Sequence, residues 1–403
     1  MKLLEPFLQW QEEIKTIRRD LHAHPELAFQ EQRTSDRVAE LLAKWGIPID
    51  RGLGGTGVVG IIKGSKAGGG AIGLRADMDG LPMQELNSFD HASRHEGKMH
   101  GCGHDGHTAM LLNAARYLAE NRDFAGTVYL IFQPAEEGGN AGARRMIEDG
   151  LFKKFPMDAV FGMHNWPGMK AGQFGVTPGP IMASSNLVTI TIEGKGTHAG
   201  MPHLGADPIM AAVQTAQAIQ TIVSRNRHPL EAAVVSITQI HAGSAMNVIP
   251  TVAELKGTVR TFTTETLDLI EKRMGEIVTS TSKAMGCEGT LKFERKYPPT
   301  VNTEAETAFC VDVMKSIVGP ENVDPKVVPT MGAEDFSFML QEVPGCYIWI
   351  GNGMGDHRDA GHGLGPCMLH NGSYDFNDEL LPLGATYWVR LAQTWLAANE
   401  GKH

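Results

Sequence analysis

The chain has 403 residues, and its share of 42% hydrophobic and 20% charged residues is typical of a globular protein rather than a disordered or fibrous one. This length exceeds that of one ordinary hydrophobic core, so we expect two domains. The 46 acidic and 36 basic residues give a formal charge of -10, which argues against nucleic acid or an anionic membrane as a partner.

The N-terminal segment predicts an amphipathic helix, because apolar residues from Phe7 to Leu21 recur every three or four positions between charged ones. It offers no signal peptide, and no apolar stretch approaches the roughly 20 residues that span a bilayer. The five cysteines are scattered and include no CxxC pair, which favours a reducing compartment over a disulfide framework. We therefore expect a cytoplasmic protein.

Strand-like runs alternate with helical ones through the first part of the chain. Runs at Gly57–Lys63 and Ala71–Asp77 precede a helical stretch at Thr108–Asn121, and further strands begin at Thr127 and Asp158. Such alternation predicts an α/β layered domain.

The order of elements changes near Pro178–Pro180. It then reads strand, helix, strand, strand, helix, strand, over Leu187–Glu193, Asp207–Arg225, Ala233–Ile240, Val252–Phe262, Thr264–Ala284 and Thr290–Lys296. This βαββαβ order predicts a ferredoxin-like α+β insert. After Pro298–Pro299 the α/β pattern resumes, with a strand at Tyr347–Gly351 and a last helix from about Leu380 to Ala398. The predicted fold is α/β: a two-segment domain (1–182 and 300–403) with a central mixed sheet flanked by helices, and an insert at 183–299.

The densest cluster of potential ligands is the segment His100-Gly-Cys-Gly-His-Asp-Gly-His107, which we place just before a helix. In an extended segment, Cys102 and His104 project to the same side. A thiolate and an imidazole are good ligands for a transition metal. The alternative for this segment alone is a glycine-rich turn with an inert thiol.

A pair of glutamates follows an apolar strand in Gln133-Pro-Ala-Glu-Glu-Gly-Gly139. Adjacent carboxylates on extended backbone point in different directions, so one can bind metal while the other acts as general base on a reacting water. A lone Glu-Glu pair is more often a solvated loop, but a strand end is where α/β domains place site residues.

Two histidines, one at a strand end in FGMHNWP and one in LHNGS, complete a set of five candidate ligands: Cys102, His104, Glu137, His164 and His370. Five ligands are too many for one tetrahedral zinc and suit two ions. Asp77 and Asp79, in RADMDGLP at another strand end, can orient ligand histidines or the base. The alternative for these two aspartates is an ordinary Asp-Gly turn.

Six motifs in order resemble the M20 metallopeptidase family, and within it the hippurate hydrolases, N-acyl-amino-acid amidohydrolases and auxin-conjugate hydrolases. They are GLRADMDGLP, MHGCGHDGHT, FQPAEEG, FGMHNWP, GKGTHAGMP and LHNGSYDFND. The likeness runs from RRDLHAHPELAFQE to the last helix. It implies that the same five residues bind two divalent metals, that Glu136 is the general base, and that Asp77 assists it.

The resemblance also implies roles for the insert, as a lid that mediates dimerisation. His198, in its GTHAG motif, is expected to reach a neighbouring subunit's site and stabilise the oxyanion. Asn247 and Arg260 fall where the family binds the substrate carboxylate, and arginine suits that planar group through paired hydrogen bonds.

The predicted function is metal-dependent hydrolysis of the amide bond of a small N-acyl amino acid, hippurate-like, N-benzoyl or N-acetyl. The metals are zinc or manganese, with cobalt or nickel also compatible, and the protein is a dimer or tetramer through the lid. One alternative is a dipeptidase or aminopeptidase of the same family. Another is a cysteine hydrolase with Cys102 as nucleophile and His104 as base, which leaves the other ligands unexplained. A third is a non-catalytic metal-binding protein, against which the surplus Glu136 argues.

Overall fold

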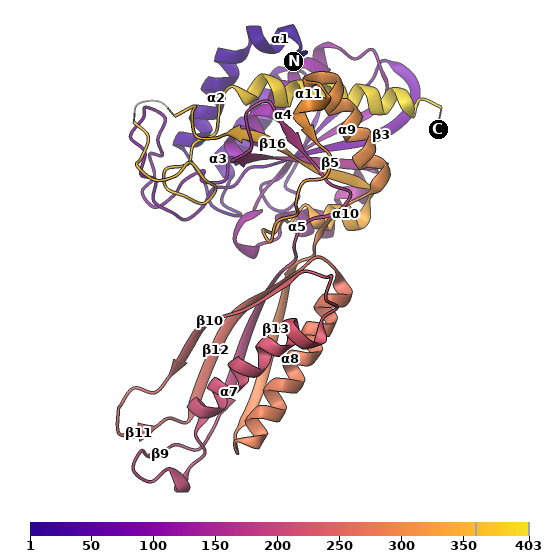
Figure 1. Ribbon diagram of the computed structural model, residues 1–403. Helices are drawn as coiled ribbons and strands as arrows, with labels where there is room; N and C mark the ends of the chain where they lie inside the picture. Colours follow the sequence, from indigo (N-terminus) through magenta and orange to yellow (C-terminus); the bar gives the residue numbers. More distant parts are fainter. Residues whose placement is uncertain (359–360, 402–403) are drawn as a thin grey trace. The chain divides into compact units, whose positions relative to one another are not determined.

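The structure is a computed structural model that describes residues 1–358 and 361–401 (Figure 1). The chain divides into two compact units. Unit 1 comprises Met1–Ile181, Val301–Val328 and the chain from Asp335 onward, and unit 2 comprises Met182–Thr300 and Pro329–Glu334. No described helix is long and apolar enough to cross a membrane.

Unit 1 is built on an eight-stranded mixed sheet with the order β1-β2-β4-β3-β5-β16-β6-β15. The strands are β1 (Ile49–Arg51), β2 (Val58–Lys63), β3 (Lys66–Asp77), β4 (Ala125–Gln133), β5 (Ala159–Pro167), β6 (Phe174–Gly175), β15 (Val323–Asp324) and β16 (Gly345–Gly353). The four central strands β4, β3, β5 and β16 are parallel. They are buried along most of their length, which explains why their sequences are nearly continuous apolar runs. The predicted mixed sheet flanked by helices is confirmed.

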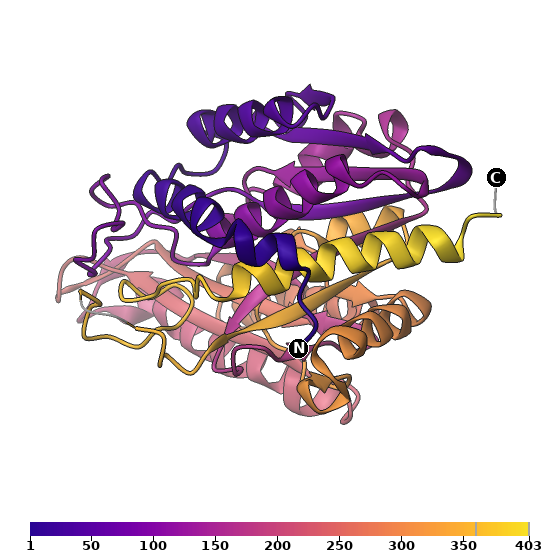
Figure 2. The same cartoon turned by 90° about the horizontal axis from the view of Figure 1, so that it is seen from above.

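Helices cover both faces of this sheet. On one face lie α1 (Glu5–Gln9), α2 (Gln11–Ala23), α3 (Gln32–Lys44), α4 (His104–Glu120), α9 (Glu304–Val318) and α11 (Leu380–Ala398); on the other lie α5 (Gly142–Glu148), α6 (Leu151–Lys154) and α10 (Ser337–Glu342) (Figure 1). The view from above shows α11 crossing the first helical layer (Figure 2). It packs against α4 at Gly384, where an added Cβ would lie 2.0 Å from the Met110 sulfur.

Two predicted boundaries in unit 1 were wrong. The N-terminal helix is divided at Trp10, whose ψ of 1° ends α1 and begins α2. The helix expected from Thr108 begins instead at His104, inside the Cys/His motif, because Gly103 takes up a left-handed conformation (φ 90°) directly before it. Cys102 and His104 therefore do not share an extended segment.

Unit 2 has the predicted βαββαβ order. Its elements are β8 (Ser185–Glu193), α7 (Pro208–Thr221), β10 (Ala233–Ala242), β12 (Val252–Thr261), α8 (Thr264–Ala284) and β13 (Glu288–Tyr297). The strands pair antiparallel in the order β10-β12-β8-β13, the ferredoxin-like arrangement, and α7 and α8 pack side by side against the sheet (Figure 1). The expected long helix is shorter, since the chain after Thr221 forms a π-helical turn.

Side-chain caps begin both helices of unit 2. Asp207 accepts hydrogen bonds from the backbone N–H groups of Ile209 and Met210, and Thr263 accepts one from Thr266. The remaining short strands form two-stranded sheets, β9 (Thr197–His198) with β11 (Val248–Ile249) and β7 (Gly179–Met182) with β14 (Thr300–Asn302).

Candidate metal centre

The candidate ligands of unit 1 gather at the carboxyl edge of the parallel strands. Asp77 ends β3, the glutamate pair follows β4, and His164 lies near the end of β5. Because these strands run in one direction, their carboxyl ends meet at one edge of the sheet. The segment that leads into α4 supplies two further ligands at this edge, Cys102 and His104. Gly103 lets it approach β5 closely, since a Cβ added at Gly103 would lie 2.3 Å from the Asn165 side-chain nitrogen.

The structure brings all five predicted ligands together. The Cys102 sulfur lies 3.4 Å from Nε2 of His164, and Nε2 of His370 lies 3.1 Å from Oε1 of Glu137. Cys102, His104 and His164 can present ligand atoms within 4.8 Å of one another, and so can Cys102, Glu137 and His370. Cys102 is the member that these two groups share.

The donor set and its burial fit a bound cation. Nε2 of His104 is buried and makes no hydrogen bond within the described part of the chain; Oδ2 of Asp77 lies 3.7 Å away. A buried imidazole nitrogen of this kind needs a partner, since an unpaired polar group in the interior is costly. Thiolate, imidazole and carboxylate together are a usual set for zinc and similar divalent ions.

Asp79 orients both a candidate ligand and the glutamate turn. Its Oδ1 lies 3.2 Å from Nδ1 of His104, and its Oδ2 accepts a hydrogen bond from the backbone N–H of Glu137 at 2.9 Å. Asp77 instead contacts Nδ1 of His107 at 2.7 Å and Arg75 at 2.7 Å. Of the two aspartates, Asp79 therefore has the more direct support role, whereas the assisting role of Asp77 stays a prediction.

Charges in this region shift several pKa values. Burial lowers the pKa of His104, but Asp77 and Asp79 outweigh it and raise that pKa to about 10. Burial raises the pKa of the Cys102 thiol well above its usual value, and Glu137 and Glu136 raise it further. Burial also holds the pKa of His164 well below its usual value. Neighbouring carboxylates thus raise the pKa of both His104 and Cys102, and an environment rich in buried carboxylates favours a bound cation.

Two residues next to the glutamate pair escaped the sequence reasoning. Oε1 of Glu136 accepts a hydrogen bond from the backbone N–H of Asp335 at 3.4 Å, and Asp335 also accepts one from the Ala143 N–H at 2.9 Å. Glu31 accepts one from the Ala135 N–H at 2.9 Å. The signals were weak: Glu31 ends the N-terminal motif RRDLHAHPELAFQE, and Asp335 belongs to a plain Glu-Asp pair.

Comparison with known proteins places the chain in a family. Residues 73–394 match the sequence profile of Peptidase family M20/M25/M40. The chain is also 41% identical over 396 residues to a hippurate hydrolase of Campylobacter jejuni, covering 98% of this chain and 100% of that one. The chain belongs to this peptidase family. The resemblance that the sequence motifs indicated is confirmed.

Other relatives of this M20 chain agree. It is 42% identical over 342 residues to an N-acetyl-L-cysteine deacetylase of Bacillus subtilis, covering 85% of this chain and 80% of the relative. A solved Bacillus subtilis structure, described as a dinuclear metal binding peptidase from the M20 family, matches with a TM-score of 0.83 and 33% identity over 97% of this chain and 99% of that one.

The predicted substrate residues of the M20 chain lie in unit 2. His198 and Asn247 line a cavity of about 690 Å³ within that unit, next to the β9–β11 pair. Both are exposed, and the Ala199 N–H donates to the Asn247 carbonyl at 3.0 Å. Arg260 lies on β12 and is not among the described residues that line this cavity. Unit 2 thus brings two of the three together.

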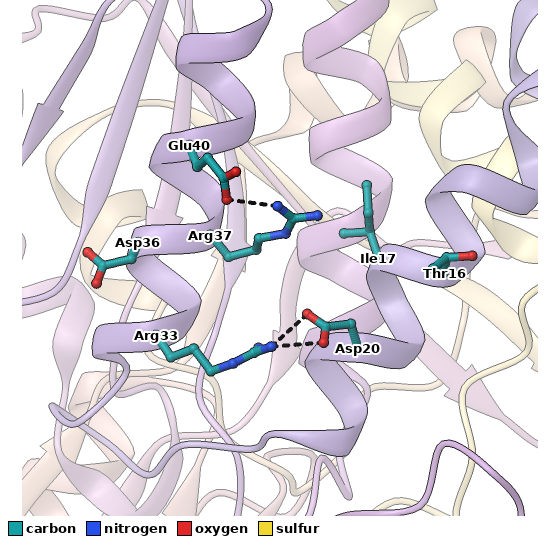
Figure 3. A pocket seen from close by; sticks show the side chains of 7 residues that line it. All are labelled: Thr16, Ile17, Asp20, Arg33, Asp36, Arg37 and Glu40. Carbon is teal, nitrogen blue, oxygen red and sulfur yellow. Dashed lines mark hydrogen bonds and ion pairs between the residues drawn. The ribbon is translucent and has the colours of Figure 1, made fainter.

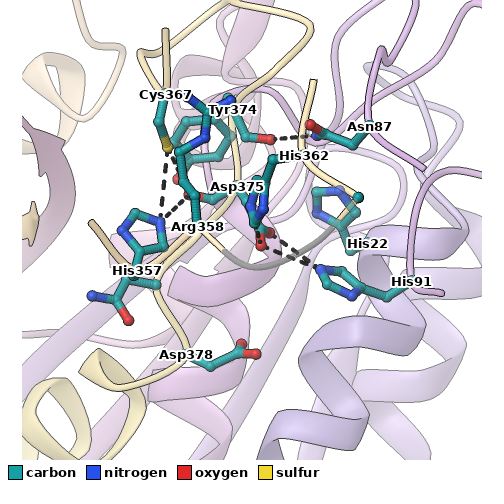
Figure 4. Close-up of polar contacts among 12 residues, drawn as sticks. His22, Asn87, His91, His357, Arg358, His362, Cys367, Tyr374, Asp375 and Asp378 are labelled. Atoms are coloured by element: carbon teal, nitrogen blue, oxygen red, sulfur yellow. Dashed lines mark hydrogen bonds and ion pairs between the residues drawn. The ribbon is translucent and has the colours of Figure 1, made fainter. Parts of the chain in front are cut away.

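A second polar cluster of unit 1 centres on Asp375. Nε2 of His91 lies 3.3 Å from its carboxylate, and Nε2 of His362 lies 3.4 Å from it (Figure 4). Arg18, fully buried, contacts Asp375 at 3.0 Å, Asp105 at 3.3 Å and Asp378 at 2.7 Å. The cluster is a compensated set of buried charges that joins α2, the start of α4 and the loop before α11.

A surface groove between α2 and α3 does not resemble a catalytic site (Figure 3). It is lined by Thr16, Ile17, Asp20, Arg33, Asp36, Arg37 and Glu40. Arg33 binds both oxygens of Asp20 at 2.8 and 2.9 Å, and Arg37 binds Glu40 at 2.7 Å. Its charges are therefore largely paired within its own walls.

Proposed function

We propose that this M20 protein is a metal-dependent hydrolase that cleaves the amide bond of N-acyl amino acids, releasing a carboxylic acid and a free amino acid. One observation carries the proposal: five potential metal ligands meet in unit 1, and the buried carboxylate of Glu136, which is not one of the five, lies beside them. The hippurate hydrolase and deacetylase relatives support an acylated amino acid as the substrate.

Two divalent ions fit the ligand set, with Cys102, His104, Glu137, His164 and His370 holding them. When bound, such ions supply Lewis acidity that lowers the pKa of water and polarises an amide carbonyl. Zinc or manganese suits these donors, and cobalt or nickel is also compatible. The dinuclear description of the solved M20 relative supports two ions in preference to one.

Glu136 is the proposed general base. Its carboxylate is 7% exposed, and its ligand atom can lie within 4.8 Å of those of His104 and Glu137. It takes a proton from the attacking water as the new C–O bond forms, and returns that proton to the leaving nitrogen as the C–N bond breaks. Asp77 is proposed to assist by fixing His107, whose Nε2 accepts a hydrogen bond from the Asn165 N–H at 3.0 Å.

Unit 2 is proposed to be a lid and a dimerisation domain, with a dimer or tetramer as the assembly. In this proposal His198 of a neighbouring subunit stabilises the developing oxyanion. Asn247 and Arg260 bind the substrate carboxylate. The joint position of His198 and Asn247 on one cavity of unit 2 supports a shared task for these two. A cytoplasmic location is proposed as well, because the five cysteine thiols are free.

The test is turnover of benzoyl-glycine, acetyl-amino acids and dipeptides, side by side, by wild type and Glu136→Gln. The variant should lose well over about 100-fold in kcat, given what a general base contributes, while its metal content stays unchanged. Glu148→Gln, on the exposed side of α5, is the matched control and should keep full activity. A Glu136→Gln enzyme with near-normal turnover contradicts the assignment.

The same assay separates the alternatives. Preferential cleavage of dipeptides indicates a dipeptidase of the same family. Chelator treatment should abolish activity, and added divalent ion should restore it. Full activity in chelator favours a Cys102 nucleophile instead.

A further inference from the structure

The turn that presents the glutamate pair begins with a strained residue. Ala135 has a φ of 54°, in the left-handed region that residues with a side chain seldom adopt. A conformation of this kind persists only where surrounding contacts fix it. Phe29, far away in the sequence, has a φ of 62° and is strained in the same way.

One carboxylate oxygen, Oε1 of Glu31, accepts a hydrogen bond from the backbone N–H of both strained residues. Oε1 of Glu31 accepts the backbone N–H of Phe29 at 3.0 Å and that of Ala135 at 2.9 Å, and Oε2 accepts the Thr56 hydroxyl at 2.7 Å. Glu31 is fully buried, so its carboxylate has exchanged water for these donors. Burial raises the pKa of Glu31 to about 7, although the hydrogen bond from Thr56 opposes the rise.

Contacts on both sides bracket Glu136. Glu31 accepts a hydrogen bond from the N–H of Ala135, directly before Glu136, and Asp79 accepts one from the N–H of Glu137, directly after it. The Ala135 carbonyl also accepts the Gly142 N–H at 3.0 Å, which closes the loop. The peptide units that carry Glu136 therefore have little freedom to rotate.

We propose that Glu31 is a positioning residue: by holding the left-handed turn at Ala135, it sets the orientation of Glu136 and Glu137. It touches neither substrate nor reacting atoms and acts only through the backbone. The inference rests on the proposed function of Glu136 as the general base. Small misplacement of a catalytic group is costly, on the order of 100-fold for about 1 Å.

The test compares Glu31→Ala with Glu31→Gln. Glu31→Ala removes the acceptor and should lower kcat by about 10- to 100-fold, with KM changed by less than about threefold, since the group that moves acts on the chemical step. Glu31→Gln keeps an oxygen for the two N–H groups, and its amide can donate to the Thr56 hydroxyl. It should restore kcat to within about threefold of wild type. Rates are expressed per metal-loaded site.

Glu26→Ala is the matched control. Glu26 accepts the backbone N–H groups of Arg33 and Thr34 at 3.0 and 2.8 Å, at the start of α3, and is not a contact of the glutamate turn. This variant should lose stability without losing kcat. Equal losses of kcat in Glu26→Ala and Glu31→Ala overturn the proposal, because they indicate a general structural effect.

Amide hydrogen exchange gives a readout that needs no activity. In chelator-treated protein, Glu31→Ala should speed exchange in a peptide covering residues 133–143, whereas Glu26→Ala should not. Unchanged exchange there overturns the positioning role even when turnover falls. A wild type without amidohydrolase activity refutes the proposed function, while the exchange comparison still decides whether Glu31 holds the turn.

If Glu31→Ala does not fold, Glu31→Asp carries the same test. It keeps a buried carboxylate but withdraws it by one methylene, so the bond to Ala135 lengthens. An intermediate loss of kcat with faster exchange at 133–143 supports the proposal, and wild-type values of both overturn it.

Discussion

Replacement of Arg18 by Met should destabilise unit 1 strongly. Arg18 is fully buried and is the shared partner of Asp105, Asp375 and Asp378. Methionine preserves much of the apolar stem and removes only the charge and its hydrogen bonds. Breaking a buried ion pair from one side costs about 3–5 kcal/mol, because a charge is left without compensation.

The structure places the expected cost near the lower end of that range. Asp378 keeps its contact with Arg19 at 2.8 Å, and Asp105 keeps His22 at 2.8 Å. The loss therefore falls mainly on Asp375, and we expect about 3 kcal/mol of unfolding free energy. At about 2 °C per kcal/mol for a unit of this size, Tm should fall by roughly 6 °C.

We expect to measure this loss of stability by thermal and urea unfolding. The variants compared are Arg18→Met and Arg19→Met, both treated with chelator. Arg19 shares the acceptor Asp378 and the same helix, but its side chain is 36% exposed. A surface ion pair contributes at most about 1 kcal/mol, so Arg19→Met should lower Tm by no more than about 2 °C. Equal small shifts in both variants refute the argument that the buried charge is decisive.

The pH dependence provides a further check. Burial opposes ionisation of Asp375, but Arg18, His362 and His91 outweigh it and hold its pKa well below the usual value. A depressed folded pKa gives stability that is present above the unfolded pKa of about 3.9 and is lost as the pH falls. The difference in unfolding free energy between wild type and Arg18→Met should therefore be largest at pH 6 and decrease toward pH 3.

Three further predictions follow from other contacts. Burial lowers the pKa of His22, but Asp105 and Glu85 outweigh it and raise that pKa to about 10. The stabilisation from protonated His22 is therefore full below about pH 6.5 and is lost toward pH 10. In urea unfolding, the difference in unfolding free energy between wild type and His22→Gln should be smaller at pH 9.5 than at pH 6. The Trp166 ring stacks on that of Trp349, with 4.0 Å between centroids, and lies 6.1 Å from the ring of His164. Trp166→Ala should therefore lower kcat/KM for benzoyl-glycine about 10-fold more than for acetyl-glycine. Equal losses for the two substrates contradict this prediction. Zinc or manganese at about 100 times its Kd should stabilise wild type by about 2.7 kcal/mol, and calorimetry should show little of this gain in a Cys102→Ala variant.

Much of the fold is encoded in long periodic segments. The apolar runs of β3, β4, β5 and β16 and the βαββαβ order of unit 2 were all evident, because many residues in succession carry each pattern. Short elements carry too little pattern of their own. The two-residue strands β6, β9, β11 and β15 exist only because neighbouring strands pair with them, so they could not be predicted locally.

Some helices were missed although their pattern is present. In α3, Val38, Leu41 and Leu42 follow helical spacing and are buried, and α9 buries Cys310, Met314 and Ile317 in the same manner. The division at Trp10 is different, since nothing in the local spacing interrupts the helical pattern there. The long-range contact of α1 with α11 is likewise invisible in the local spacing.

The candidate site was predictable where a rule of topology applies. Ligands at the ends of parallel strands must approach one another, and this rule covers His164 and the glutamate pair. It does not decide between Asp77 and Asp79, because the chain leaves β3 between them. Nor does it reveal Glu31, whose importance comes from a left-handed residue 104 positions away in the chain.

The distribution of buried charge in unit 1 supports a cation at the candidate centre. A buried carboxylate is tolerated when a cation or strong donors compensate it. Arg18 compensates Asp375 and Asp105, and Arg75 compensates Asp77 and Asp335 at 2.7 and 3.0 Å.

Glu137, only 8% exposed, differs from these carboxylates. Its one ion-pair contact in the described chain is the imidazole of His370, which is itself half-exposed and a weaker counter-charge than a guanidinium. The chain thus supplies arginines to these two acid clusters and leaves Glu137, beside Cys102 and His104, with thiol and imidazole neighbours instead. That arrangement is stable and chemically sensible when divalent ions provide the missing positive charge.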